Sequence, residues 1–236
     1  REALRMDPQQ RILLELAWRC MENAAISPDC LSRLQTGVYV GVINHDYERL
    51  ILFDREQISQ YSALGRSTSI AANRISYCFN LHGPSLTIDT ACSSSLTAVD
   101  SACRALRSGN VDAALAGGAN AIVLPESYIE FTQASMLSKA GMCQAFDKNA
   151  HGFVRAEGGG LVMLKRLFDA LVDGDRIYAP IVASSVNQDG RTIGLMAPNP
   201  EAQVRMMPNS LQQCGLHPSD IGYVEALGSG TQLGDP

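Results

Sequence analysis

Cys92 is the residue whose surroundings in this sequence most favour nucleophilic chemistry. It lies in the stretch TIDTACSSS (87–95), where an apolar run gives way to small and hydroxylated residues. The alternating segment 85–90 predicts a strand that ends just before Cys92, and a helix is expected to begin near Ser93 or Ser94. The unpaired N–H groups and positive dipole end of a helix N-terminus favour a thiolate and can stabilise an oxyanion. The pattern is therefore typical of a nucleophile elbow with cysteine in place of serine.

The other six cysteines have ordinary surroundings. They are expected to be buried structural thiols where they fall in helical patterns, or loop residues with no base nearby in sequence. The helical set is Cys20, Cys78, Cys103 and Cys214, and the loop set is Cys30 and Cys143. An odd total of seven, with no CxxC pair and no Cys/His cluster at zinc spacing, predicts free thiols, no metal site and a reducing, cytoplasmic location.

Composition excludes several classes of protein. With 236 residues, 46% hydrophobic and 18% charged, the chain is typical of a globular domain with a large buried core. A net charge of −5 argues against nucleic acid as the main partner, since phosphate binding needs a basic surface. No apolar stretch is long enough for a membrane span, so no membrane association is expected. The chain begins at Arg1 without a methionine and ends just after GDP, which suggests a piece of a longer protein.

Strands and helices are expected to alternate along the chain. The predicted helices are 8–24, 68–79, one from Ser93 or Ser94 to Gly109, a short piece at 167–175, and 201–214, which Pro208 should kink or break. In the third helix, one face is predicted to contain Leu96, Val99, Cys103 and Leu106. The predicted strands are 37–43, 85–90, 111–120, 158–167, 178–187 and 222–227. Such alternation predicts an α/β fold with a largely parallel sheet.

Six stretches together resemble one family. DTACSSSLTAV is similar to the active-site segment of beta-ketoacyl synthases, specifically the ketosynthase domains of type I polyketide synthases. The other stretches occur along the chain in the order that the family has: MDPQQRILLELAW (6–18), GPSLTIDTACSSSL (83–96), ALAGGAN (114–120), MLSKAGMCQAFDKNAHGFVRAEGGG (136–160) and VNQDGRTIGLMAPN (186–199). The resemblance runs the whole length, and residues 1–236 are expected to be a partial ketosynthase domain, truncated at both ends.

The resemblance implies a thiolase-like fold of five αβαβα layers, of which this chain holds the N-terminal half and the start of the C-terminal half. It implies that Cys92 accepts an acyl chain from the phosphopantetheine arm of an acyl carrier protein. Decarboxylative Claisen condensation with a malonyl-type extender would follow, because a covalent thioester divides a difficult step into two easier ones. It also implies a homodimer, neighbouring synthase domains such as an acyltransferase as partners, and no metal or redox cofactor bound by the domain itself.

The sequence departs from the family at a motif usually written VEAHGTGTxxGDP. Here it is VEALGSGTQLGDP, with Leu227 in place of a catalytic histidine and Ser229 in place of a threonine. An isobutyl group cannot stabilise a developing enolate oxygen, and loss of one such donor typically costs ~100- to 1,000-fold in rate. By the same resemblance, Ser229 and Thr231 would hydrogen-bond the pantetheine amides. The family's second histidine and its lysine would lie beyond Pro236.

Leu227 leaves four interpretations open. The domain is a condensing ketosynthase; or it is a non-elongating ketosynthase that transfers acyl chains through Cys92 but condenses poorly; or Leu227 and Ser229 are sequence errors, each of which a single base change could produce. From a different class, it is a noncatalytic dimerisation and docking module, although the intact surroundings of Cys92 argue against this. A cysteine hydrolase fits less well, because no base and orienting acid can be identified.

The remaining motif residues have weaker signals. The histidines are expected to be solvated loop or turn residues rather than substitutes for the missing one: His45, His82, His151 and His217. Asp147 and Glu157 match family positions, and they are expected either to hold loops near the site or to serve as plain surface or turn residues. EGGG (157–160) is no phosphate loop, since it lacks both the P-loop lysine and the GxGxxG spacing.

Overall fold

The computed structural model describes residues 1–53, 56 and 58–235. The chain divides into two compact units. The first comprises Arg1–Leu124 with Glu157–Pro180, and the second comprises Pro125–Ala156 with the chain from Ile181 onward. Among the described residues, no helix is both long enough and apolar enough to span a membrane.

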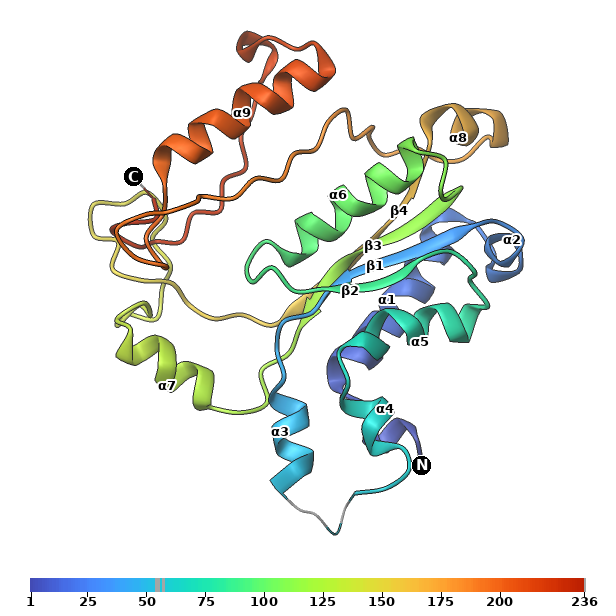
Figure 1. Ribbon diagram of the computed structural model, residues 1–236, viewed down its shortest axis with the longest axis horizontal. Coiled ribbons are helices and arrows are strands. Elements are labelled where there is room, and N and C mark those ends of the chain that lie inside the picture. The colour runs from blue at the N-terminus through green and yellow to red at the C-terminus, as the bar shows by residue number, and fades with distance from the viewer. Residues whose placement is uncertain (54–55, 57, 236) are drawn as a thin grey trace. The chain divides into compact units, whose positions relative to one another are not determined.

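The first unit is built around a four-stranded sheet with the strand order β2-β1-β3-β4 (Figure 1). Its strands are β1 (Thr36–Gly41), β2 (Ser85–Ile88), β3 (Ala113–Asn120) and β4 (Gly158–Lys165). β1 runs parallel to both β2 and β3, whereas β4 pairs with β3 in the antiparallel direction. The predicted, largely parallel sheet is therefore confirmed, with one antiparallel strand at its edge.

Most predicted helices are also confirmed, although their ends differ by a residue or two. The first unit contains α1 (Pro8–Ala24), α2 (Pro28–Ser32), α3 (Asp46–Phe53), α4 (Ser62–Arg66), α5 (Ser69–Phe79), α6 (Ser94–Arg107), α8 (Leu167–Asp173) and a 3-10 turn at Ala3–Arg5. The second contains α7 (Glu126–Gln133), α9 (Pro200–Cys214) and a 3-10 turn at Pro218–Asp220. α1 begins where Asp7 accepts a hydrogen bond from the N–H of Gln9 and Pro8 occupies the first helical position.

Helices cover both faces of the sheet. α1 and α5 pack on one face, where Leu13 and Ile75 lie in a buried cluster with Val38. α6 packs on the other face, where Ala98 lies in a second cluster with Tyr39. Val38 and Tyr39 are neighbours in β1 and point to opposite faces, because side chains alternate along a strand. β1 is buried along its whole length for this reason.

Two predicted strands are wrong. Residues 178–187 and 222–227 have no regular secondary structure. A strand needs a neighbour to bond its backbone N–H and C=O groups, and sheet pairing in the described residues is confined to β1–β4. Helix α9 continues without interruption through Pro208. Of the predicted kink or break at Pro208, the break is therefore absent.

One further hydrogen bond joins β3 and β4 beyond the last residue pair of their antiparallel ladder. Asn120 lies opposite Gly158, and just past them a carboxylate oxygen of Glu157 accepts a 2.6 Å hydrogen bond from the N–H of Ile122. The chain leaves the first unit after Leu124 and returns to it at Glu157. The points of departure and return are therefore bound to each other, which is the loop-holding role predicted for Glu157.

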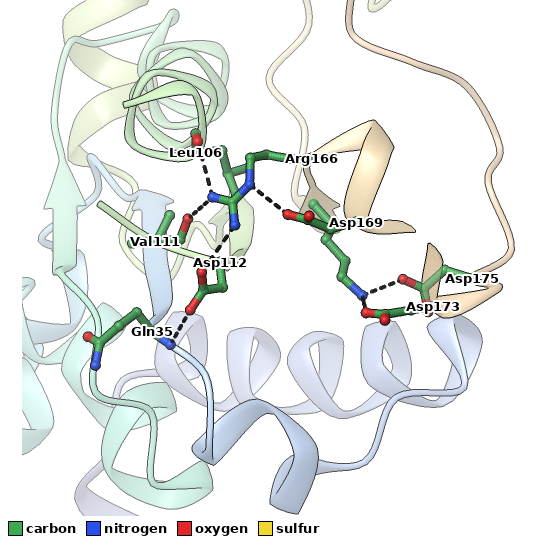
Figure 2. A network of polar contacts seen from close by, with 9 residues as sticks. Gln35, Leu106, Val111, Asp112, Arg166, Asp169, Asp173 and Asp175 are labelled. Carbon is green, nitrogen blue, oxygen red and sulfur yellow. Dashed lines mark hydrogen bonds and ion pairs between the residues drawn. The ribbon is translucent and has the colours of Figure 1, made fainter. Parts of the chain in front are cut away.

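Arg166 joins the end of β4 to the C-terminal end of α6 (Figure 2). Its Nη1 donates hydrogen bonds to the backbone oxygens of Leu106, at 3.3 Å, and Val111, at 2.7 Å. Its Nη2 donates to Asp112 at 3.1 Å and its Nε to Asp169 at 2.6 Å. One guanidinium thus satisfies two backbone carbonyls and two carboxylates at the end of the sheet distant from Cys92.

Asp112 also bonds the start of β1. Its carboxylate accepts a 3.1 Å hydrogen bond from the N–H of Gln35, and its own N–H donates to the carbonyl of Gln35 at 2.8 Å. The Gln35 N–H, followed by the Arg166 guanidinium, holds the pKa of Asp112 below its ordinary value of 3.8. Ionised Asp112 therefore stabilises the fold above pH 3.8, and this contribution is lost as the pH falls through the lowered pKa.

Replacing Arg166 with methionine is expected to destabilise the first unit. The change removes the hydrogen bonds from the guanidinium to two carbonyls and two carboxylates, which should lower the free energy of unfolding by about 1–3 kcal/mol. The lower part of this range is expected, because the Arg166 side chain is 34% exposed. Urea unfolding followed by the fluorescence of Trp18, the chain's only tryptophan, measures the change in this unit.

Arg19→Met is the matched control, because Arg19 is 69% exposed and its ion pair in the described residues is with Glu15 on the same helix. Its expected effect is below about 0.5 kcal/mol. Equal losses in the two variants would show that the Arg166 contacts contribute no more than a surface ion pair.

Candidate active site

Cys92 lies in the short connection between β2 and α6, and its side chain is exposed. This is the predicted strand, turn and helix arrangement, with the helix beginning at Ser94. The φ angle of Ala91 is +54°, in the left-handed region. A non-glycine residue in such a conformation carries about 1–3 kcal/mol of strain. The strain of the elbow therefore falls on the residue immediately before the thiol.

Of the three serines that follow Cys92, only Ser94 is buried, with 4% of its surface exposed. Its hydroxyl accepts a 2.8 Å hydrogen bond from the N–H of Thr90 and donates a 2.6 Å hydrogen bond to the carbonyl of Ala91. Both contacts are made to residues on the strand side of Cys92. Ser94 therefore closes the elbow and stabilises the strained conformation of Ala91.

The remaining polar residues of the elbow bond to one another. The hydroxyl of Ser93 donates to the carbonyl of Thr90 at 2.8 Å, and Thr90 Oγ1 donates to Thr97 Oγ1 at 3.1 Å. The Asp89 carboxylate accepts the N–H of Ala91 at 3.1 Å. Within the described part of the chain, no side chain is hydrogen-bonded to the Cys92 thiol. These hydroxyls and the carboxylate therefore build the turn.

Two glycines allow α6 to begin beside the sheet. Gly41 and Gly118 lie opposite each other at the carboxyl ends of β1 and β3. A Cβ atom on Gly41 would lie 2.7 Å from backbone atoms of Ser94 and Ser95, and one on Gly118 would lie 3.2 Å from the Cβ of Ser95. Any larger residue at Gly41 would push the first turn of α6, and Cys92 with it, away from the sheet.

The buried face of α6 differs from the prediction. Leu96 is 74% exposed, whereas Cys103 and Leu106 are buried as expected. Ser94, Ala98 and other small residues form the part of the face that meets the sheet. Leu96 is two residues, or about 200°, around the helix from both Ser94 and Ala98, so it points away from the sheet. Burial raises the pKa of the Cys103 thiol above 9.0, consistent with its predicted structural role.

The other cysteines are free thiols, as are Cys92 and Cys103. Cys20 and Cys214 are half-buried in helices, in keeping with a structural role. Cys78 is exposed on α5, so its predicted burial is wrong. In the described residues, no group of three or more His, Cys, Asp or Glu side chains is arranged to hold a metal ion.

The second unit brings Ser229 and Thr231 together. Their hydroxyl oxygens lie 2.9 Å apart, and both side chains are half-buried. Gly228 and Gly230, which alternate with them, have φ angles of +56° and +66°, conformations that favour glycine. The carbonyl of Gly230 accepts a 2.8 Å hydrogen bond from the N–H of Gly152. The two predicted substrate-binding hydroxyls thus form one pair on a loop with a defined conformation.

Leu227 precedes this loop, and 83% of its surface is exposed. Its side chain therefore has no packing role in the second unit that would explain a leucine there. The histidines occupy loops as predicted, and His217 caps the 3-10 turn at Pro218–Asp220 by accepting the N–H of Ser219. Asp147 accepts the N–H of Asn149 at 2.7 Å, so of its two predicted roles the structure supports the turn-capping one.

The chain matches two family models. The N-terminal domain model of beta-ketoacyl synthases matches residues 1–170, and the C-terminal domain model matches residues 178–236. The chain is 50% identical over 235 residues to a phenolphthiocerol/phthiocerol polyketide synthase of Mycobacterium tuberculosis, covering 100% of this chain and 12% of that protein. It is 46% identical to polyketide synthase PksN of Bacillus subtilis, covering 100% of this chain and 4% of that one.

Solved ketosynthases share the fold. The oxazolomycin ketosynthase domain OzmH KS7 of Streptomyces albus superposes with a TM-score of 0.93 at 42% identity, covering 99% of this chain and 40% of that one. The ketosynthase from module 6 of the bacillaene synthase of Bacillus subtilis gives 0.90 at 42% identity, covering 98% and 39%. The expected thiolase-like α/β fold is confirmed, and the chain spans less than half of each solved domain.

Replacing Ser94 with alanine is expected to loosen the elbow. The change removes two hydrogen bonds from a buried hydroxyl and should cost about 1–3 kcal/mol in unfolding free energy. Ser95→Ala is the matched control, since Ser95 is exposed and its loss is expected to cost below about 0.5 kcal/mol. Urea unfolding followed by Trp18 fluorescence measures both, and iodoacetamide alkylation of Cys92 reports the local change. Identical stability and alkylation rates in the two variants would contradict the closing role of Ser94.

Proposed function

The chain belongs to the beta-ketoacyl synthase family, and we propose that it forms the thiol-bearing part of a polyketide synthase ketosynthase domain that lengthens acyl chains by decarboxylative condensation. The observation that supports this most is Cys92, an exposed thiol held at the N-terminus of α6 by a strained elbow. On this proposal residues 1–236 are part of a longer ketosynthase domain. Ketosynthases of the family act on acyl chains as thioesters, so thioester carbonyls are the expected electrophiles.

In the first step proposed for Cys92, its thiolate attacks the thioester carbonyl of an acyl group on the phosphopantetheine arm of an acyl carrier protein. A new sulfur–carbon bond forms, the pantetheine sulfur leaves and takes up a proton, and the acyl group remains on Cys92. The oxyanion formed on the way needs hydrogen-bond donors. The first-turn N–H groups of α6 are suited to this role, except that of Ser94, which donates to the carbonyl of Ala91 at 3.0 Å.

In the second step, a malonyl-type thioester loses carbon dioxide and becomes a carbanion at its α-carbon. This carbon attacks the carbonyl of the acyl-Cys92 thioester, a carbon–carbon bond forms, and the Cys92 thiolate leaves. The product is a beta-ketoacyl thioester on the carrier protein. Ser229 and Thr231 are proposed to bind amide groups of the pantetheine arm, since their paired hydroxyls lie 2.9 Å apart on a half-buried loop.

The proposed partners are an acyl carrier protein, neighbouring synthase domains such as an acyltransferase, and a second copy of the domain. β2 supports the last of these. It lies at the edge of the sheet, and in the described residues no strand pairs with its outer side. Leu86 of β2 is 47% exposed, and Tyr77 of the neighbouring α5 is 87% exposed. An open strand edge with apolar side chains is a surface that proteins normally cover.

Light scattering of the complete domain tests the dimer. A concentration of about one micromolar is suitable, because interfaces of ordinary size hold two protein molecules together in this range. A charge on the β2 edge should weaken it, so Leu86→Lys is expected to be monomeric. Leu171→Lys, a change at a 65% exposed leucine of α8, is the control and should remain dimeric. A monomeric wild-type domain, or a dimer unaffected by Leu86→Lys, would contradict this part of the proposal.

Leu227 favours a second candidate function, a non-elongating ketosynthase. Acyl transfer to Cys92 uses the elbow and the proposed pantetheine-binding hydroxyls but no side chain at position 227, whereas the condensation step of the family it resembles uses a histidine where this chain has Leu227. Leucine has no donor for an enolate oxygen, and its side chain is 83% exposed here. On this version the domain receives an acyl chain and passes it on without lengthening it.

One experiment tests both versions. The complete domain is loaded from an acyl carrier protein, then given malonyl carrier protein, and intact-mass spectrometry follows Cys92 acylation and ketoacyl product. Acylation with rapid condensation supports the elongating function. Acylation without product supports the non-elongating one, and Leu227→His is then expected to raise condensation by ~100- to 1,000-fold. Cys92→Ala should abolish acylation, and a wild-type domain that is not acylated at Cys92 would refute both versions.

A further inference from the structure

We propose that Asp235 is a positioning residue that fixes the Ser229 and Thr231 hydroxyls in one donor and acceptor arrangement, so that the pair recognises a single amide group. The inference rests on the pantetheine-binding role proposed above for these hydroxyls. What is new is Asp235, which is proposed to act on the pantetheine arm only through these two hydroxyls. The hydrogen bonds of Asp235 described below lie within the second unit.

Asp235 is the centre of the hydrogen bonds of this loop. One carboxylate oxygen accepts the hydroxyl of Ser229 and the N–H of Gly230, each at 3.0 Å. The other accepts the N–H of Phe146 at 2.7 Å and is also 3.1 Å from the N–H of Gly230. Asp235 therefore joins the Ser229–Thr231 loop to the AFD segment, residues 145–147, which is distant in the sequence.

Both segments joined by Asp235 contain a residue in the left-handed backbone conformation. Phe146 has a φ angle of +61°, which is strained for a non-glycine residue, and Gly230 has one of +66°. The two segments are also in close contact, since a Cβ atom on Gly228 would lie 2.9 Å from the Cβ of Ala145. The carboxylate accepts N–H groups from both Phe146 and Gly230, so it stabilises both conformations at once.

The negative charge of Asp235 determines which acceptor each of the two hydroxyls donates its hydrogen to. A carboxylate only accepts hydrogen bonds, so Ser229 must donate its hydrogen to Asp235. Within the pair, Thr231 must then be the donor and Ser229 the acceptor. Thr231 Oγ1 in turn accepts the N–H of Gly234 at 3.0 Å. The carboxylate thereby removes the ambiguity of two hydroxyls that could each donate or accept.

This arrangement matches one secondary amide. Ser229 can only accept from a ligand, and it suits an amide N–H. Thr231 can turn its hydrogen from Ser229 to a ligand carbonyl, and it suits the C=O. The Phe146 N–H, and then the Ser229 hydroxyl and the Gly230 N–H, hold the pKa of Asp235 below its ordinary value of 3.8 although burial opposes this shift. The carboxylate is therefore ionised at neutral pH.

Asp235→Asn tests the inference in the complete domain. The substitution replaces one carboxylate oxygen with an NH2 group. This group cannot accept the hydrogen bonds that the oxygen accepted. The KM of acetyl-pantetheine for acylation of Cys92 is expected to rise about 10-fold, with kcat nearly unchanged. Alkylation of Cys92 by iodoacetamide, which has no pantetheine arm, is expected to keep its wild-type rate. Asp235→Glu retains the charge and should recover part of the lost affinity.

Asp220→Asn is the matched control. Asp220 is an exposed aspartate of the same unit that also accepts a backbone N–H, that of His217 at 2.8 Å, but it has no contact with the Ser229–Thr231 loop. Its KM should equal that of the wild type. Circular dichroism and thermal melting of every variant separate a lost fold from a lost contact, and Asp235→Glu provides the comparison if Asp235→Asn does not fold.

A double-mutant cycle tests whether Asp235 acts through Ser229. Ser229→Ala should raise KM, and adding Asp235→Asn to it should change KM little further. Fully additive effects, or a folded Asp235→Asn domain with a wild-type KM, would overturn the positioning role. Absence of wild-type acylation by acetyl-pantetheine would instead overturn the proposed function, so the two failures are distinguishable.

Discussion

The close approach of α6 to the carboxyl ends of β1 and β3 is the constraint on which the Cys92 elbow depends. Gly41 leaves room for the backbone of Ser94, and a Cβ atom there would be only 2.7 Å from it. Because the helix begins so near the sheet, Ser94 is buried, and its hydroxyl must find partners in the turn. Those partners hold Ala91 in its strained conformation, which leaves Cys92 exposed. Packing, hydrogen bonding and backbone strain here have one common cause.

The second unit fixes its loop by different means. Ser229 and Thr231 lie outside regular secondary structure, on a loop that no strand of the described residues supports. The rigidity that a sheet gives to Cys92 must come from polar contacts instead. Asp235 supplies them, together with the hydrogen bond from Gly152 to Gly230. Loss of one hydrogen-bond acceptor is expected to change the structure of such a loop only near that acceptor. Replacement of a glycine beneath a packed helix is expected to move the whole first turn of the helix.

Much of the first unit could be predicted because its signals are local. The Cys92 elbow needs only a strand pattern, a helix pattern and the residues between them, and α1 has both periodicity and a cap. The exposure of Leu96 could not be predicted, since it depends on which face of α6 packs against the sheet. Residues 178–187 resemble a strand, yet a strand requires a partner elsewhere in the chain. Asp235 was missed for a similar reason, because its hydrogen bond to Phe146 joins residues 89 positions apart.

The hydrogen bond between Glu157 and Ile122 has a consequence for how this domain can vary. It closes the ladder of β3 and β4 at the place where the chain leaves the first unit and later returns. The ends of the segment Pro125–Ala156 are therefore held together whatever its length. Lengthening a loop whose ends are already joined costs little entropy, only about 0.6 kcal/mol for each doubling. Residues inserted into this excursion away from Phe146 and Gly152 are thus expected to leave the register of β4 and the sheet beneath Cys92 unchanged.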